Sequence, residues 1–174
     1  MITESPRLIL RQFRDGDQQA LFAMNSTPEV LRYIPGEPLK DIEEAGQVLE
    51  KVIFADYRKY GYGRWAVEHK ADGKVIGFCG PKFLPEFGKV ELGYRYLPEY
   101  WGQGLGYEAA SHALPKIKAI CAVNELIALI MAGNLGSEAI ALKLGMLPQE
   151  ESELMGHKIR VFRRTFLRYP RLHL

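Results

Sequence analysis

Features of exported, membrane-spanning and disulfide-stapled proteins are missing from this sequence. Its only two cysteines, Cys79 and Cys121, form no CxxC or Cys/His motif, so we expect two reduced thiols in the core and no metal site. The longest apolar run, residues 126–133, is far shorter than the roughly 20 residues that a membrane helix needs. The first 17 residues mix charges into their apolar positions and contain no signal-peptide core. We therefore expect a soluble, cytoplasmic protein without a membrane partner.

An excess of charge of either sign is also missing. Lysine and arginine number 23 against 21 aspartates and glutamates, a formal net charge of +2. That balance gives no electrostatic reason to expect a nucleic-acid partner. The basic stretch RVFRRTFLRYPR at 160–171 is interpreted as a strand with a solvated face. With 47% hydrophobic residues in 174, the chain can form one core, and we expect a single domain over residues 1–174.

Apolar periodicity and turn signals predict a mixed α/β chain. Helices are expected after the turn at 15–17, on both sides of the breaker PGEP at 35–38, from about residue 104, and over 136–145. Strands are expected at 7–13, on both sides of the ADGK turn at 71–74, and at 88–98, 125–134 and 156–167, with 147–154 as an optional extra. Pro115 predicts a kink or an early end, near residue 114, in the helix that starts near 104.

The stretch YWGQGLGYEAA at 100–110 places three glycines at alternate positions in front of a predicted helix. A helix start has up to four backbone N–H groups without internal partners and carries a partial positive charge, so it binds phosphate readily. Removing every Cβ at Gly102, Gly104 and Gly106 would let a pyrophosphate reach those groups. A tight turn that needs positive φ is the alternative explanation for one or two of the glycines. Neither the dinucleotide pattern GxGxxG nor the P-loop fits, because Tyr107 stands where each requires a glycine.

The stretch WGQGLG resembles the helix-opening loop [QR]-x-x-G-x-[GA] of the GNAT superfamily of N-acetyltransferases, with Trp101 at its first position. Four further stretches resemble that superfamily in matching order, namely SPRLILRQF, GRWAVEHKADGKVIGFCG, VELGYRYLPEYWGQG and GNLGSEAIALKLGM. With a tryptophan at this position, the loop resembles that of the branch typified by the RimJ and RimL ribosomal-protein N-terminal acetyltransferases. The resemblance implies an α/β acyl-CoA acyltransferase fold of the GNAT type. Its mixed, mostly antiparallel sheet would have about six to seven strands, splayed between the fourth and fifth, with about four helices.

The resemblance also implies acetyl-CoA as cosubstrate. Backbone N–H groups after Gly102 would hold its pyrophosphate, and its pantetheine arm would pair with the exposed edge of the fourth strand. Asn134 resembles the residue that contacts this arm, with a helix cap as its alternative role. The residues implied for cofactor binding are Tyr94, Tyr96, Leu97, Gly102, Gln103, Gly104, Leu105, Gly106, Tyr107, Asn134 and Ser137.

Three residues are candidates for the chemistry. Glu91 resembles the strand-four carboxylate that serves several family members as base, and a salt-bridged or substrate-orienting carboxylate is its alternative role. A backbone N–H near Tyr96 would stabilise the developing oxyanion. Many members protonate the thiolate with a tyrosine at the position of Ala141, so the resemblance implies Ser137 as the acid instead, with helix capping as the alternative. His112 is interpreted as a surface or packing residue.

The resulting hypothesis is an acetyl-CoA-dependent N-acetyltransferase in which a primary amine attacks the thioester directly. The branch makes a protein or peptide α-amine the first candidate acceptor, and a polyamine, an amino acid or a drug amine are the alternatives. The acceptor would enter between residues 33–38 and the last hairpin. A non-catalytic acyl-CoA-binding sensor is the alternative from a different functional class. The resemblance also suggests a homodimer as one assembly to test.

Overall fold

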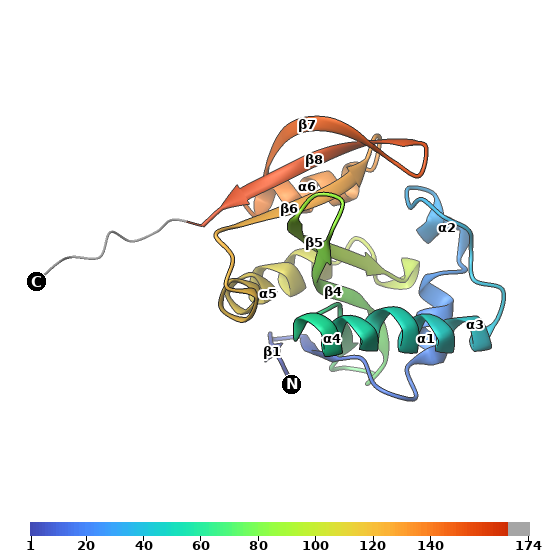
Figure 1. Ribbon diagram of the computed structural model, residues 1–174. Helices are drawn as coiled ribbons and strands as arrows, with labels where there is room; N and C mark the ends of the chain where they lie inside the picture. The colour runs from blue at the N-terminus through green and yellow to red at the C-terminus, as the bar shows by residue number, and fades with distance from the viewer. Residues whose placement is uncertain (167–174) are drawn as a thin grey trace, which may run out of the picture.

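The computed structural model describes residues 1–166, which form one eight-stranded sheet with helices packed on both faces (Figure 1). In spatial order the strands are β1 (Thr3–Glu4), β2 (Leu8–Gln12), β3 (Trp65–His69), β4 (Val75–Leu84), β5 (Lys89–Tyr96), β6 (Glu125–Met131), β8 (His157–Thr165) and β7 (Leu147–Leu154). All neighbours are antiparallel except β5 and β6, which run parallel. The mixed, mostly antiparallel sheet is therefore confirmed.

Six α-helical segments cover this sheet. They are α1 (Gln18–Met24), α2 (Pro28–Leu31), α3 (Ile42–Val48), α4 (Ala55–Tyr60), α5 (Leu105–Cys121) and α6 (Leu135–Lys143), with a short 3₁₀ turn at Pro98–Tyr100. A π-helical segment, Leu49–Phe54, joins α3 to α4 without a break. The Asp41 side chain begins this long helix by accepting the Glu44 N–H at 2.8 Å, and Gly61 ends it in the left-handed conformation.

The strand count corrects the expectation of six to seven. The optional strand at 147–154 exists, and the strand that the sequence did not reveal is β1. β1 has only two residues, too few to show an alternating pattern, and it forms by pairing with β2. With α3 to α4 taken as one helix there are five helices in residues 1–166, against about four expected. The predicted closing strand extended to residue 167, which lies outside the described residues.

The sequence predicted a kink or an early end of α5 near residue 114, and the early end is wrong, because the helix continues to Cys121. A proline inside a helix costs about 3 kcal/mol. Burial offsets that cost here, since Ala113, Leu114 and Ile117 are all buried in the larger of the two core clusters. Each fully buried large aliphatic side chain contributes about 1.5–3 kcal/mol. Tertiary packing therefore carries the helix through the proline.

The parallel neighbours β5 and β6 pair at a single register position, Glu91 opposite Ile127. Beyond that position β5 continues to Tyr96 alongside β4 only, and β6 continues to Met131 alongside β8 only. The expected splay between these two central strands is therefore confirmed. It opens the sheet in the middle of the molecule, where an unpaired strand edge faces a gap.

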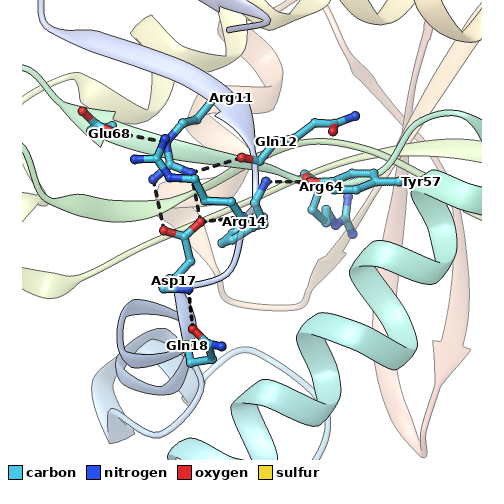
Figure 2. A network of polar contacts seen from close by, with 10 residues as sticks. Arg11, Gln12, Arg14, Asp17, Gln18, Tyr57, Arg64 and Glu68 are labelled. Carbon is cyan, nitrogen blue, oxygen red and sulfur yellow. Dashed lines mark hydrogen bonds and ion pairs between the residues drawn. The ribbon is translucent and has the colours of Figure 1, made fainter.

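A buried polar network fixes one corner of the sheet (Figure 2). Arg11 of β2 donates to both carboxylate oxygens of Asp17 at 2.9 and 3.0 Å, and to Glu68 of β3 at 3.1 Å. Nearby, the Tyr57 hydroxyl of α4 donates to the backbone oxygen of Arg64. This second contact ties the long helix to the residue before β3, and so places the Arg64 side chain.

Candidate functional site

A cavity of about 1030 Å³ occupies the splay. One half lies against the glycine-rich loop, the start of α5 and the start of α6. The other half is formed by α2 and the residues after it, by Arg64 just before β3, by side chains of β4 and β5, and by the β7–β8 turn, and we call it the acceptor half. Its lining residues include Tyr33, Ile34, Pro35, Arg64, Phe78, Glu91, Arg95, Leu154, Met155 and Ile159. Both segments expected to admit an acceptor therefore line this cavity.

The loop before α5 presents bare backbone to the cavity. Gly102 and Gly104 have φ of +72° and +78°, the left-handed region that favours glycine. No side chain caps α5, and Glu108 N–H to Gly104 oxygen, at 3.1 Å, is the first backbone bond of the helix. Within residues 1–166, the N–H groups of residues 104 to 107 make no hydrogen bond to protein. The helix start is therefore free to bind an anion.

All three glycines also have a structural reason to be glycine. Two adopt positive φ, and a Cβ on the third, Gly106, would lie 2.8 Å from Ile140 Cδ1 and 3.1 Å from the Tyr96 ring. Gly106 therefore allows α5 to pack closely on α6 and β5. The turn explanation considered above accounts for two glycines and packing accounts for the third, so the unbonded N–H groups are the better indication of an anion site.

Arg7 and Glu108 anchor this loop from the other side. Arg7 Nη1 donates to the Gln103 oxygen at 3.0 Å, and its Nε donates to Glu108 at 2.9 Å. Ser5 also donates to Glu108, at 2.6 Å. Burial acts to raise the pKa of the Glu108 carboxyl, but the hydrogen bonds from Ser5 and Arg7 prevail and lower that pKa. Gln103 does not line the cavity: its oxygen accepts from Arg7 and its side-chain amide donates to the Glu99 oxygen, so the structure does not bring this residue to the site.

At the open edge of β5, the backbone N–H and C=O groups of every second residue point into the gap. Leu97 N–H donates to Ile76 of β4 at 2.9 Å, so by strand alternation the backbone groups of Tyr94 and Tyr96 point into the gap. Leu97 faces away, its oxygen accepts the Tyr100 N–H, and it does not line the cavity. The structure thus brings the two tyrosines, but not Leu97, to the splay.

One position on this edge is already occupied. The Trp101 indole N–H donates to the Tyr96 oxygen at 2.8 Å. The Tyr96 ring is buried in the core, its hydroxyl has no hydrogen-bond partner in residues 1–166, and burial raises its pKa well above the ordinary value. Tyr96 can therefore serve the site through its backbone N–H and not through its side chain.

Residues at the start of α6 lie across the gap from β5. Asn134 caps the helix by accepting the Ser137 N–H at 3.3 Å, and both residues line the cavity. The Tyr94 hydroxyl donates to the Ser137 oxygen at 2.7 Å. The capping role of Asn134 is confirmed and leaves the Ser137 hydroxyl out of the cap. Ala141, one turn further on, is fully buried in the core.

Glu91 lines the cavity as an ion pair. Its Oε1 accepts from Nη2 of Arg64, whose Nη1 also donates to the Gly80 oxygen at 2.9 Å. A Cβ on Gly93 would lie 2.4 Å from Arg64 Nη1, so this glycine makes room for the guanidinium. The salt-bridged role considered for Glu91 is therefore observed. Its Oε2 makes no hydrogen bond within residues 1–166 and is free to accept one from a ligand.

Arg64 and Arg95 were missed by the sequence reasoning. Their guanidinium carbons lie 5.3 and 5.2 Å from the centre of the Phe78 ring, and both residues line the cavity. A sequence signal existed for Arg95, because residues 91, 93 and 95 of a strand share one face. Arg64 precedes its strand, so no periodicity could place it.

A second hollow of about 580 Å³ adjoins the start of α5. Its charged lining residues are all basic, namely Lys118, Lys143 and Arg164. Tyr107 and Lys143 line both this hollow and the cavity at the splay. The two spaces therefore adjoin along the same positively charged side of the helix start.

Other expected features lie outside these two spaces. His112 is exposed and its Nδ1 is 2.9 Å from the Glu108 oxygen. Cys79 and Cys121 are free, and burial raises the pKa of each thiol to about 12. In residues 1–166 no group of three or more potential ligand side chains could hold a metal ion. Among the helices of the same residues, none combines the length and apolar character needed to cross a membrane.

Comparison with known proteins gives a consistent result. A family model described as an acetyltransferase (GNAT) domain matches residues 7–147. The uncharacterised N-acetyltransferase YoaA of Bacillus subtilis (strain 168) is 32% identical over 145 residues, which cover 83% of this chain and 81% of that protein.

Solved structures share the fold at lower identity. Spermidine N-acetyltransferase from Vibrio cholerae, in complex with CoA and spermine, superposes with a TM-score of 0.76 at 15% identity over 92% of this chain and 96% of that one. The ribosomal L7/L12 alpha-N-protein acetyltransferase RimL, in complex with coenzyme A, gives a TM-score of 0.75 at 17% identity over 95% and 97%. At these identities the likeness concerns the fold alone, and it does not assign a branch.

Proposed function

This chain belongs to the GNAT family of acetyltransferases and is an N-acetyltransferase, and from that premise we propose that it transfers the acetyl group of acetyl-CoA to a primary amine. The observation that carries the proposal is the set of unbonded backbone N–H groups at the start of α5, which open into a cavity at a splayed sheet edge. A pyrophosphate and an amide-bearing arm are the chemical groups that such a surface satisfies.

We place the coenzyme along three features. The N–H groups of residues 104 to 107 hold the pyrophosphate, with Gly102 leaving the approach open. The backbone of Tyr94 pairs with the pantetheine arm in the splay. Lys118, Lys143 and Arg164 in the adjoining hollow offer cations to the remaining phosphate of the nucleotide.

Acetyl-CoA supplies an activated thioester, and the residues at the splay organise its attack by the amine. The N–H groups of Tyr94 and Tyr96 both face the gap, and one of them donates to the oxygen that becomes negatively charged. Glu91 accepts a proton from the attacking amine through its free Oε2, directly or through water. Ser137 lies across the gap and passes its hydroxyl proton to the departing thiolate while it takes a proton from water. A thiol pKa of about 8.5 makes this last step a modest aid.

The acceptor is a primary amine that enters between α2 and the β7–β8 turn. A protein or peptide α-amine remains our first candidate, supported by the RimJ- and RimL-like stretch around Trp101. A small-molecule amine is the alternative. Because both cysteines are unpaired, we also propose that the protein works in a reducing compartment such as the cytoplasm.

The cofactor assignment is tested by Gly104→Leu with Gly61→Leu as its matched control. The two glycines have φ of +78° and +77° with no backbone close by, so both variants incur the same left-handed strain of about 1–2 kcal/mol. We expect about a 100-fold weaker Kd for CoA in Gly104→Leu, measured by calorimetry, because the side chain covers the anion site. The Gly61→Leu variant keeps its affinity. Equal affinity in both variants contradicts the assignment.

Turnover is measured separately, as thiol release from acetyl-CoA with a panel of amines. Release with at least one amine supports the enzyme. Tight CoA binding without release for any amine indicates the non-catalytic sensor instead.

A further inference from the structure

Two guanidinium groups and one carboxylate share the acceptor half of the cavity. Glu91 and Arg95 lie on the same face of β5, and Phe78, the register partner of Arg95 on β4, packs between Arg95 and Arg64. The single carboxylate of Glu91 is used by Arg64. The group Arg64, Glu91 and Arg95 therefore has a net charge of +1, which Arg95 contributes.

Arg95 itself has only a neutral partner. Its Nη1 donates to the side-chain oxygen of Asn25, and its buried Nε has no hydrogen-bond partner among residues 1–166. No carboxylate of the described chain lies within 4 Å of it. Burial, with a smaller contribution from Arg64, lowers the pKa of Arg95 to about 10. The surroundings therefore disfavour the charged form, but the guanidinium is still charged at neutral pH.

The other charged residues around the cavity do not neutralise the positive charge of Arg95. Lys82 is paired with Asp56 at 2.7 Å. Glu29 and Glu86 are exposed residues at the rim, where Arg32 lies over the Tyr33 ring. A half-buried cation that has no anionic partner and a buried Nε without a hydrogen bond is costly, and an anion that arrives with the ligand reduces that cost. A polyamine would add positive charge beside Arg95 and increase it.

We propose that Arg95 binds a carboxylate of the acceptor, so that the substrate is a primary amine that also carries a carboxylate. This inference rests on the proposed function. Arg95 is the residue after Tyr94 on β5, about 3.3 Å further along the strand. In the proposed function the Tyr94 N–H faces the gap in which the thioester reacts. The amine and the carboxylate of the acceptor are therefore close together. A free amino acid and a peptide that begins with an acidic residue both have this chemistry.

The test compares acceptors that differ only in the carboxylate, with thiol release as the readout. Aspartate is paired with asparagine amide, the peptide amide Glu-Ala-Ala is paired with Gln-Ala-Ala, and spermidine serves as the polyamine. We expect at least a tenfold higher kcat/KM for the carboxylate member of a pair, because a charge-assisted hydrogen bond is lost without it. The pair that shows the preference identifies the source. Equal rates within both pairs, or spermidine as the best acceptor, overturn the proposal.

Variants show whether Arg95 is responsible. Arg95→Gln should lower kcat/KM for the carboxylate member alone, so that the kcat/KM values of the two acceptors in a pair become nearly equal. Arg95→Lys should keep part of the preference for the carboxylate member. The Kd for CoA stays unchanged in both. Arg14→Gln, at an exposed residue that does not line the cavity, is the control and keeps the full preference. A preference that survives in a folded Arg95→Gln contradicts the assignment.

Binding of a dicarboxylate gives a second measurement, and the shift in Tm of the wild-type chain needs neither a variant nor an active acceptor. Glutarate should inhibit turnover of a neutral amine and raise the Tm of the wild-type chain, whereas glutaramide should do neither. Glutarate without either effect overturns the carboxylate site. If no amine is acetylated but CoA binds, the catalytic proposal fails alone, and the glutarate shift in wild type against Arg95→Gln still decides the role of Arg95.

Discussion

Arg11 and Arg95 show how differently this fold treats a sequestered guanidinium. Arg11 is 9% exposed and has a bidentate pair with Asp17, a third hydrogen bond to Glu68 and a fourth to the Gln12 oxygen. Arg95 has one neutral amide and an Nε without a partner in residues 1–166. The chain itself supplies anionic partners for Arg11, whereas within residues 1–166 it supplies none for Arg95.

The same contrast separates the corner around Arg11 from the splay as a whole. At the corner, polar groups from β2, from the turn before α1 and from β3 hydrogen-bond to one another (Figure 2). At the splay, the first N–H groups of α5 and the edge of β5 beyond Glu91 have no strand or cap to bond. Polar groups in folded proteins are nearly always hydrogen-bonded. A cluster of polar groups without a partner therefore indicates where a ligand binds.

The contrast predicts that damage at the corner changes stability and leaves acceptor choice alone. Asp17→Asn should lower the free energy of unfolding by about 3 kcal/mol, because it removes one partner of a buried ion pair while Glu68 remains. Urea unfolding measures the change. Arg58→Gln, in a pair whose side chains are each 61% exposed, is the control and should have no measurable effect. A variant Asp17→Asn that keeps its stability but changes its acceptor preference would reverse the comparison.

At the splay the opposite behaviour is expected of Ser137. Ser137→Ala should lower kcat about tenfold, since proton donation to a good leaving group contributes less than the usual general acid. Its Tm should stay close to wild type, because Asn134 caps α6 and the Ser137 backbone is retained. Steady-state kinetics and a thermal melt test both points, with Ser152→Ala on β7 as the control. An unchanged kcat would remove Ser137 from the chemistry.

Glu108 sharpens the comparison, because it is a fully partnered carboxylate beside the open loop. Its pKa is lowered from 4.5, so its contacts add stability above the unfolded pKa, and that contribution is lost as the pH falls through the lower folded value. Glu108→Gln should cost about 1 kcal/mol at pH 7, a value reduced by the exposure of Arg7. The difference from wild type should shrink below about pH 4.5. A difference that is the same at pH 7 and pH 3 would exclude the carboxylate as its source, and the exposed Glu99→Gln variant is the control.

The sequence predicted best what the backbone alone determines. Alternation and turn signals placed most strands, and the glycines at 102, 104 and 106 located the loop. β1 was missed because two residues cannot show an alternating pattern. An early end of α5 was one of two predicted outcomes because the helix cost of Pro115 was weighed without the burial of the side chains around it. Leu97 was assigned to the open edge because the side that a backbone group faces depends on register, which one strand does not reveal.

Side-chain partnerships were beyond the reach of pattern alone. The pair of Glu91 with Arg64 joins residues 27 positions apart and needs Gly93 to leave space between them. Arg95 carries meaning only once its missing partner is known, and that is a property of three strands and α1 together. The cofactor half of the site was therefore foreseeable from one stretch of chain, whereas the acceptor half was not.

The hydrogen bond from the Trp101 indole to the Tyr96 oxygen occupies one of the two β5 carbonyls that face the splay. The chain runs from Tyr96 directly into the glycine-rich loop, so this carbonyl lies at the loop end of the open edge. An arm that enters from the loop side therefore has the Tyr94 oxygen as its first free acceptor on β5, and Trp101 links the geometry of the loop to the point at which pairing can begin.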